Sequence, residues 1–304
     1  MGAGVKPLQG TFDLSSWSES QLASVEQALM RWVVADAPAG LGDAMRYAVL
    51  DGGKRLRPLL VLAACEAVDG NRAAALRAAC AVELIHAYSL VHDDMPCMDN
   101  DVMRRGKPTV HVAFGEAQAL LAGDALQALA FELLAPDDDD IPAAVQARLC
   151  RLLARAAGHE GMAGGQAIDL ASVGRALDET QLRQMHRLKT GALLQGSVLM
   201  GAACGAPLAA AAAALADYGA AVGLAFQVVD DILDVTADSA TLGKTAGKDA
   251  AAAKPTYVSL LGLARSQAYA QELLAQALAA LAASGLADTR GLQALAMMVV
   301  NRDN

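Results

Sequence analysis

Two clusters of aspartates, each beside an apolar stretch, are the side chains in this sequence best placed to do chemistry. They are Asp93, Asp94 and Asp99 in the first cluster, and Asp230, Asp231 and Asp234 in the second. Carboxylates beside apolar residues are costly unless something pairs with them, and their oxygens are the ligands that Mg²⁺ prefers. Either cluster alone is equally well explained as an acidic helix end. Together they predict two facing helices that bind several Mg²⁺ ions, with substrate phosphates completing the coordination.

The residues around both clusters have helical spacing. Residues 83–92 form a mainly apolar segment with the pattern of a helix. Pro96 must interrupt this helix, because proline lacks an amide hydrogen and clashes with the preceding turn. Asp230 and Asp234 are four residues apart and therefore share a helix face, with Gln227 on an overlapping face. We therefore expect both clusters to face a common space from the walls of a helical fold.

Basic residues flank both clusters, as an acidic protein that binds phosphate requires. They are Lys54, Arg55, Arg57, Arg104, Arg105, Lys189 (followed by Thr190), Lys244, Lys248 and Lys254. Arginine can bind two phosphate oxygens at once, and lysine supplies a mobile point charge. His86 lies seven residues before Asp93, on the same helix face. Singly, each cation is best explained as a solvated surface group, but their positions beside the aspartates favour a phosphate site.

The elements that must position these residues are helices. Of the 304 residues, 55% are apolar, only 4% are aromatic and 19% are charged, which is typical of packed helices rather than of a disordered or all-β chain. Segments of ~15–35 residues between Gly- and Pro-rich breaks are long for globular helices. We find no alternating strand pattern and no linker, so the expected fold is an all-α bundle in a single domain over residues 1–304. The acidic run 137–140, between two prolines, is expected to be an exposed loop.

Charge, cysteines and known motifs exclude several classes of function. The net charge of −9 disfavours non-specific binding to nucleic acid or to anionic lipid. The N-terminus has no signal-peptide pattern, and the apolar stretch 192–225 is too often broken to predict a membrane span. Five cysteines without a C-x-x-C pair indicate a reduced, cytoplasmic protein. The Gly-Lys pairs at 243–244 and 247–248 lack the upstream glycine of a P-loop.

Taken together, the motifs resemble those of the trans-isoprenyl diphosphate synthases, in particular the bacterial farnesyl diphosphate synthases. The matching segments, in the order of that family, are 52–58 (GGKRLRP), 93–99 with 104–106, 164–166 with Asp169, 189–190, 226–234, and the loop from 243 to 257. They span about residues 43–260. A single D-D-x-x-D would be weak, but this joint match is specific.

The resemblance implies about ten core helices around a deep central cavity, usually in a homodimer. It implies a head-to-tail prenyltransferase that extends dimethylallyl diphosphate with isopentenyl diphosphate, through geranyl to farnesyl diphosphate. Three Mg²⁺ ions, for which Mn²⁺ could substitute, would bridge the allylic diphosphate to Asp93, Asp99 and Asp230. Asp94, Asp231 and Asp234 would support them.

The same resemblance assigns roles to the other site residues. Arg104, Lys189 and Lys244 would hold the allylic diphosphate, with Lys254 in the same loop as Lys244. Lys54, Arg57, His86 and Arg105 would hold isopentenyl diphosphate. Thr190 and Gln227 would face the developing carbocation. Tyr88 and Ser89, about one turn before Asp93, would form the floor that limits product length.

Several alternatives stay open on the sequence. The chemistry could stop at geranyl diphosphate or continue to geranylgeranyl diphosphate. A terpene cyclase would also use aspartates and Mg²⁺, but it would not need a second set of diphosphate-binding cations. A non-catalytic synthase subunit would be expected to lose part of an aspartate motif. A di-iron bundle needs Glu-x-x-His motifs on two inner helices, and the sequence does not supply that set.

Overall fold

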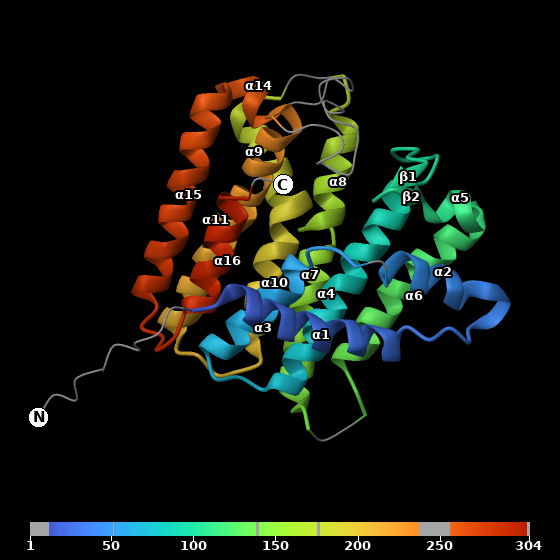
Figure 1. Ribbon diagram of the computed structural model, residues 1–304, viewed down its shortest axis with the longest axis horizontal. Helices are drawn as coiled ribbons and strands as arrows, with labels where there is room; N and C mark the ends of the chain where they lie inside the picture. The colour runs from blue at the N-terminus through green and yellow to red at the C-terminus, as the bar shows by residue number, and fades with distance from the viewer. Residues whose placement is uncertain (1–11, 51, 138–139, 175–176, 237–255, 303–304) are drawn as a thin grey trace, which may run out of the picture.

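A computed structural model describes residues 12–50, 52–137, 140–174, 177–236 and 256–302 of the chain. Nearly all of its regular structure is helical, which confirms the all-α prediction (Figure 1). The helices before the second aspartate cluster are α1 (Leu14–Trp32), η1 (Pro38–Gly40), α2 (Leu41–Val49), α3 (Leu56–Ala67), α4 (Arg72–Asp93), α5 (Val110–Phe114), α6 (Glu116–Leu134), α7 (Ala143–Ala157), α8 (Met162–Ala171), α9 (Glu179–His186), the π-helical turn η2 (Arg187–Gly191) and α10 (Ala192–Ala203). They are followed by α11 (Ala209–Thr236), α14 (Tyr257–Leu261), α15 (Leu263–Ala283) and α16 (Arg290–Val300).

Helix α4 runs through the centre of the bundle and carries the first aspartate cluster at its end. It starts where the side chain of Asn71 accepts a hydrogen bond from the amide of Ala74. Its interior is rich in buried alanines, which let α3 and α6 pack closely against it. The helix ends at Asp93, shortly before Pro96, as the sequence predicted. Asp93 therefore occupies the last helical position and Asp94 the C-cap.

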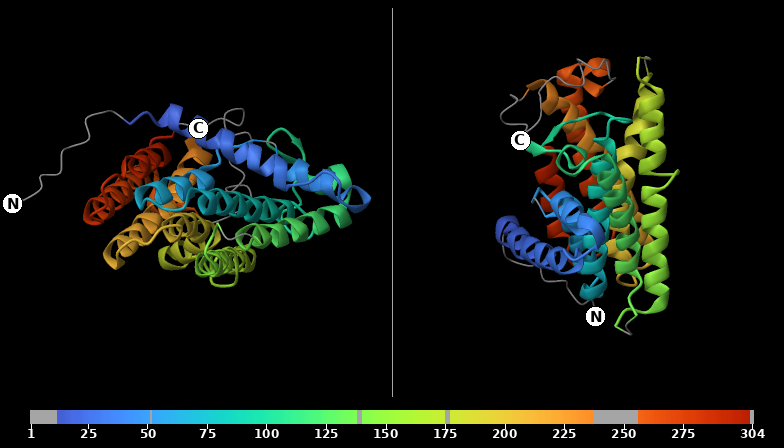
Figure 2. Two further views of the ribbon diagram at one scale, coloured as in Figure 1. Left: turned by 90° about the horizontal axis from the view of Figure 1, so that it is seen from below. Right: turned by 90° about the vertical axis from the view of Figure 1, so that its right-hand side faces the viewer.

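Helix α11 carries the second cluster and packs between α10 and α15. Gly191 and Gly223 let the backbones of η2 and α11 approach closely, because a Cβ on Gly223 would lie 3.0 Å from the Cα of Gly191. In Figure 1 the β1–β2 hairpin, which follows α4 in the chain, and α14, the next described helix after α11, lie at the same end of the bundle. Figure 2 shows α1 on the outside of the bundle, away from this end. The fold thus brings both clusters to one end.

A short hairpin follows the first cluster, where the sequence suggested no strand. Strand β1 (Met103–Arg104) pairs antiparallel with β2 (Lys107–Pro108). The two turn residues, Arg105 and Gly106, have φ values of 51° and 77°. Positive φ at both positions suits a two-residue hairpin turn. The hairpin is too short to show as an alternating pattern in the sequence, but it fixes where Arg104 and Arg105 point.

Three helices, α4, α6 and α11, are long and apolar enough to cross a membrane by length and composition. In this fold, 67%, 39% and 50% of their most apolar windows, respectively, are buried inside the protein. The stretch 192–225 that the sequence analysis considered is divided between α10 and α11, with a break at 204–208. Much of the apolar character of α4 and α11 is therefore used in packing, and α6 is the most exposed of the three.

Candidate active site

Both aspartate clusters face one continuous space. A hollow of about 390 Å³ extends from Asp93 along α4, and a second of about 330 Å³ lies beside Asp230 on α11. The two hollows share five lining residues, namely Arg57, His86, Leu90, Lys189 and Thr190. The structure thus puts a carboxylate of each cluster, Asp93 on α4 and Asp230 on α11, at adjoining hollows.

Within the first cluster, Asp93 faces the hollow. Burial raises the pKa of Asp93 to about 6, and the nearby carboxylates of Asp99 and Asp94 push it in the same direction against the opposing effect of Lys189. The amide of Asp99 donates to the backbone carbonyl of Asp93 at 2.9 Å, so the loop folds Asp99 back toward the helix end. A site in which carboxylates raise one another's pKa favours a bound cation.

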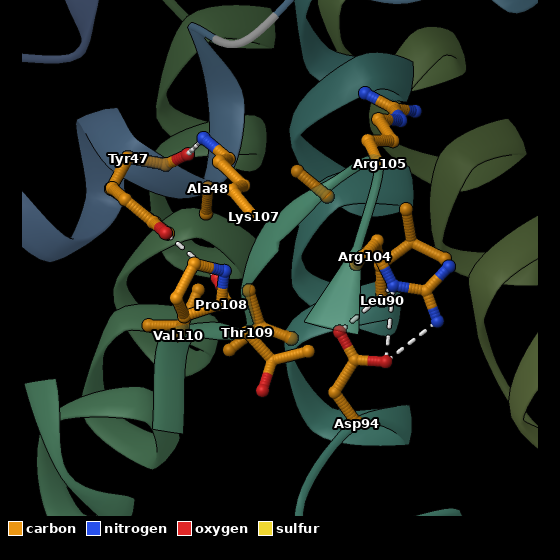
Figure 3. A pocket seen from close by; sticks show the side chains of 12 residues that line it. Tyr47, Ala48, Leu90, Asp94, Arg104, Arg105, Lys107, Pro108, Thr109 and Val110 are labelled. Atoms are coloured by element: carbon orange, nitrogen blue, oxygen red, sulfur yellow. Dashed lines mark hydrogen bonds and ion pairs between the residues drawn. The ribbon is translucent and has the colours of Figure 1, made fainter. Parts of the chain in front are cut away.

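Asp94 has a different role from its neighbour. Arg104 reaches from β1 and binds its carboxylate through Nε and Nη2 at 2.6 to 3.0 Å (Figure 3). The pair lies beside a small separate hollow of about 40 Å³ between α2, α4 and the hairpin. Asp94 therefore positions Arg104, and it is not among the residues that line the two larger hollows.

In the second cluster, both Asp230 and Asp231 line the second hollow, but their partners differ. Asp230 lines the hollow, and Nη2 of Arg302 lies 3.2 Å from its Oδ1. Asp231 is buried, and its two oxygens accept hydrogen bonds from the Gln227 amide at 2.8 Å and from the backbone N–H of Tyr257 at 2.7 Å. Asp231 therefore holds the start of α14 in place. Asp234 is buried, and its Oδ1 has no hydrogen-bond partner.

These carboxylates fit Mg²⁺ as a metal shared with a substrate. Over the described ranges of the chain, no three Asp, Glu, His or Cys side chains converge closely enough to hold a metal ion by themselves. Mg²⁺ commonly binds through one or two carboxylates, with waters and substrate phosphates completing its octahedron. The buried, unpartnered oxygen of Asp234 and the raised pKa of Asp93 are both features that a bound cation would relieve.

Two donors, Arg57 and His86, line the space, and Arg105 and Lys54 lie near it. Arg57 has a buried Nε without a hydrogen-bond partner, and burial together with Arg105 lowers its pKa to about 10, so it stays charged at neutral pH. Burial and the neighbouring guanidinium of Arg57 hold the pKa of His86 well below its ordinary value. Arg105 donates to the carbonyl of Gly52 at 2.8 Å, and desolvation lowers the pKa of Lys54. A guanidinium whose Nε is buried without a partner is well suited to an anion such as diphosphate.

Lys189 faces the space from the π-helical turn η2. Its ammonium group pairs with Asp169 of α8. A Cβ on Gly165 would lie 2.0 Å from the backbone nitrogen of Lys189, so only glycine permits this approach of α8 to η2. The neighbouring Thr190 donates to Gln227 at 3.1 Å, which links η2 to the second cluster. The structure thus gives the Gly164-Gly165 pair a reason that its sequence did not reveal.

Three further side chains of this site had no role predicted from the sequence, although Gln166 lies in the matching segment 164–166. Gln166 lines the larger hollow, and both of its amide atoms are buried without partners. His186 lines the second hollow, and its ring stacks on Tyr257 with centroids 5.6 Å apart. Arg302 reaches Asp230 from the C-terminal end and stacks on Phe226 at 4.3 Å. The position of Gln166 next to Gly164-Gly165 was a usable signal, whereas no local pattern marks Arg302.

The remaining basic residues predicted from the sequence, and the acidic run 137–140, are not among the described residues that line the two hollows. Arg55 is buried away from the space, where it pairs with Glu83 at 2.6 Å and with Glu26 at 2.7 Å. It therefore stabilises the start of α3. Lys244, Lys248 and Lys254 lie outside the described residues, as do two of the four aspartates in the run 137–140. The two described ones, Asp137 and Asp140, are exposed, in agreement with the expected loop.

The buried imidazole of His186 should make stability depend on pH. Burial lowers its pKa to about 4, whereas the unfolded chain titrates near 6.5. Between these values the unfolded state binds more protons, so we expect the free energy of unfolding to fall by up to about 3 kcal/mol as pH drops from 6.5 to 4. Urea unfolding of His186→Gln should show a shallower pH slope than the wild type, while His159→Gln, at an exposed position, should not. Equal slopes in all three proteins would contradict this assignment.

Comparison with known proteins agrees with this geometry. The family model described as polyprenyl synthetase matches residues 38–288. A probable farnesyl diphosphate synthase of Bradyrhizobium diazoefficiens is 49% identical, covering 94% of this chain and 87% of the relative. A chloroplastic geranylgeranyl pyrophosphate synthase of Catharanthus roseus is 45% identical. The match covers 97% of this chain and 83% of that relative. The crystal structure of an FPP/GFPP synthase from Zymomonas mobilis superposes with a TM-score of 0.84 at 42% identity, covering 94% of this chain and 98% of that one.

The family match covers most of the chain, and its relatives are prenyltransferases by name. The resemblance inferred from the motifs is therefore confirmed. This chain belongs to the polyprenyl synthetase family and is a prenyltransferase of isoprenoid synthesis.

Proposed function

We propose that this enzyme condenses isopentenyl diphosphate head-to-tail with dimethylallyl and then geranyl diphosphate, in a Mg²⁺-dependent reaction that ends at farnesyl diphosphate. One observation carries the proposal. Asp93 and Asp230 face the same space as Arg57, His86 and Lys189, and that space continues along α4 to Tyr88 and Ser89. Such a space has anionic and cationic walls at one end and an apolar extension at the other, as two diphosphates and a growing prenyl chain require.

The leaving group is the first requirement of this chemistry. Asp93, Asp99 and Asp230 would hold Mg²⁺ against the allylic diphosphate, and the metal when bound would act as a Lewis acid on the leaving group. Lys189, and Nη1 of Arg104, would stabilise the negative charge that develops as the allylic C–O bond breaks. Lys244, outside the described residues, would act with them, and Lys254 would support the same loop.

The second substrate and the carbocation depend on other side chains. Lys54, Arg57, His86 and Arg105 would bind isopentenyl diphosphate, whose double bond attacks the allylic cation. The oxygens of Thr190 and Gln227 would face that cation, and the apolar wall would exclude the water that could quench it. The released diphosphate would then accept the proton lost in the last step.

The product length is the finer part of the proposal. Tyr88 and Ser89 line the 390 Å³ hollow, and the hydroxyl of Ser89 donates to the carbonyl of His86. We expect Tyr88→Ala to lengthen the product by at least one isoprene unit, because the phenol ring closes the path along α4. Chromatography of the dephosphorylated products would show the shift. Tyr269→Ala, an aromatic truncation on α15, is the control, and an unchanged product in Tyr88→Ala would mean that Tyr88 is not the floor.

Geranylgeranyl diphosphate is the alternative product. It is favoured by the 45% identity to a geranylgeranyl pyrophosphate synthase, which is nearly as high as the identity to the bacterial relative.

One experiment tests the whole proposal. Purified protein is incubated with isopentenyl and dimethylallyl diphosphates and Mg²⁺, and the products are sized. A fifteen-carbon diphosphate supports the proposal, a twenty-carbon one favours the alternative, and the absence of any elongated diphosphate contradicts both. Chelation should abolish synthesis, and Mn²⁺ should restore it.

Assembly and location complete the proposal. We propose that residues 1–304 act as one domain and form a homodimer through the exposed apolar face of α5 and α6. Val112, Leu120 and Leu121, each about half exposed, support this choice of face. Sedimentation velocity would measure the oligomeric state. We further propose a cytoplasmic location, with isoprenoid diphosphates as partners and neither nucleic acid nor a membrane span involved.

A further inference from the structure

The imidazole ring of His92 fills the space that a side chain at position 123 of α6 would occupy. A Cβ built on Gly123 would lie 2.1 Å from Nε2, 2.5 Å from Cδ2 and 2.8 Å from Cε1 of His92. The same Nε2 lies 3.1 Å from the backbone carbonyl of Leu120, one turn earlier on α6. Because a carbonyl can only accept, Nε2 must carry the hydrogen. His92 is therefore held in a recess of α6 that exists only because residue 123 has no side chain.

This recess lies directly behind the wall of the larger hollow. His92 and Tyr88 both line that hollow, and their rings meet edge to face with centroids 5.7 Å apart. Gln127, one turn after Gly123 on α6, lies near the hydroxyl of Tyr88. Two side chains that line the hollow thus lie against one face of α6.

We infer that Gly123 is a specificity-determining residue for product length, and that it acts through His92. The inference rests on the proposed function, because it concerns the hollow assigned to the prenyl chain. Gly123 touches no substrate in this account. It lets the imidazole sit in the wall of the hollow, against α6, and so leaves room beside Tyr88 for the last isoprene unit.

A methyl group at position 123 would have to displace the ring. Contacts below about 3.0 Å between a Cβ and another heavy atom are essentially never seen, so His92 must turn away or α6 must move out. The α6 backbone lies on one side of the ring and the hollow on another, and we infer that the ring turns into the hollow. An imidazole is about as large as one isoprene unit. Its entry would therefore exclude the last unit added and end synthesis one step earlier.

The test compares wild type with Gly123→Ala, His92→Ala and the double variant His92→Ala/Gly123→Ala. Each is incubated with dimethylallyl and isopentenyl diphosphates and Mg²⁺, and the product ratio is measured at low conversion. We expect Gly123→Ala to raise the ratio of shorter to longer product by at least about tenfold, since filling a hydrophobic pocket by a small group discriminates on this scale. We expect the double variant to return to the ratio of His92→Ala, because the displaced ring is then absent. A purely structural role for Gly123 would change the total rate without changing this ratio.

The outcomes separate this inference from the proposed function. If the wild type makes no prenyl diphosphate, the proposed function fails. If it makes one and a folded Gly123→Ala gives the same product ratio, only the inference is overturned. If Gly123→Ala does not fold, the inference is tested by comparing the product ratios of His92→Ala and His92→Ala/Gly123→Ala. Equal ratios in His92→Ala and the double variant support the inference, and a shorter product in the double variant contradicts it, because Gly123 would then act without His92.

Discussion

Replacing Asp93 with alanine should lower turnover by at least about a thousandfold while leaving the fold intact. Asp93 is the member of the first cluster that faces the shared space, so its loss removes a carboxylate that would hold the metal against the leaving group. Stability should not suffer, because burial raises the pKa of this carboxyl and its ionised form is therefore unfavourable in the folded protein. We expect an unchanged or higher Tm. The measurements are steady-state turnover with saturating Mg²⁺ and thermal unfolding without metal.

Asp217→Ala is the matched control, since this aspartate is exposed on α11 and lies outside the shared space.

The corresponding change in the second cluster, Asp230→Ala, should lower turnover to a similar extent but should also lower Tm. Arg302, only 12% exposed, would lose the carboxylate it contacts, and an unpaired buried charge is costly. Near-normal turnover in either cluster variant would contradict the assignment of these aspartates to the metal.

Replacing Lys189 with methionine should lower kcat/KM for the allylic substrate by about a hundredfold or more. Methionine keeps most of the length of the side chain, but it removes the positive charge that would stabilise the leaving diphosphate. Loss of one such preorganised donor costs on the order of 10²–10³ in rate. Initial rates at varied allylic and isopentenyl diphosphate would show the effect. The allylic kcat/KM should fall much more than the KM for isopentenyl diphosphate rises.

The pairing of Lys189 with Asp169 requires a second variant, because the single change leaves a buried carboxylate without its ammonium partner. Lys189→Met/Asp169→Asn should recover stability without recovering activity. Recovery of both in the double variant would mean that Lys189 acts through the structure of α8 and not on the substrate. A larger effect on isopentenyl diphosphate than on the allylic substrate would reverse the assignment of the two diphosphate subsites.

Local patterns in the sequence were sufficient to predict the helices and to single out the two aspartate clusters as candidate site residues. The end of α4 at Asp93 follows from Pro96, because a proline in the interior of a helix removes a hydrogen bond and clashes with the preceding turn. The shared face of Asp230 and Asp234 follows from the helical repeat. These are short-range effects, so they could be derived from residues close together in the chain. They also led to the family resemblance that the comparisons confirmed.

The tertiary structure decided which of these side chains are available for chemistry. Asp94 and Asp231 belong to the same motifs as Asp93 and Asp230, but Arg104 and the amide of Tyr257 engage them from other parts of the chain. Arg302 and the Gly165 approach to Lys189 likewise depend on contacts between distant segments. The sequence by itself determined the helices and the kind of chemistry, because backbone preferences and ligand types are local properties. Only the packed structure determined where each carboxylate points, because that depends on which buried donors the fold places next to it.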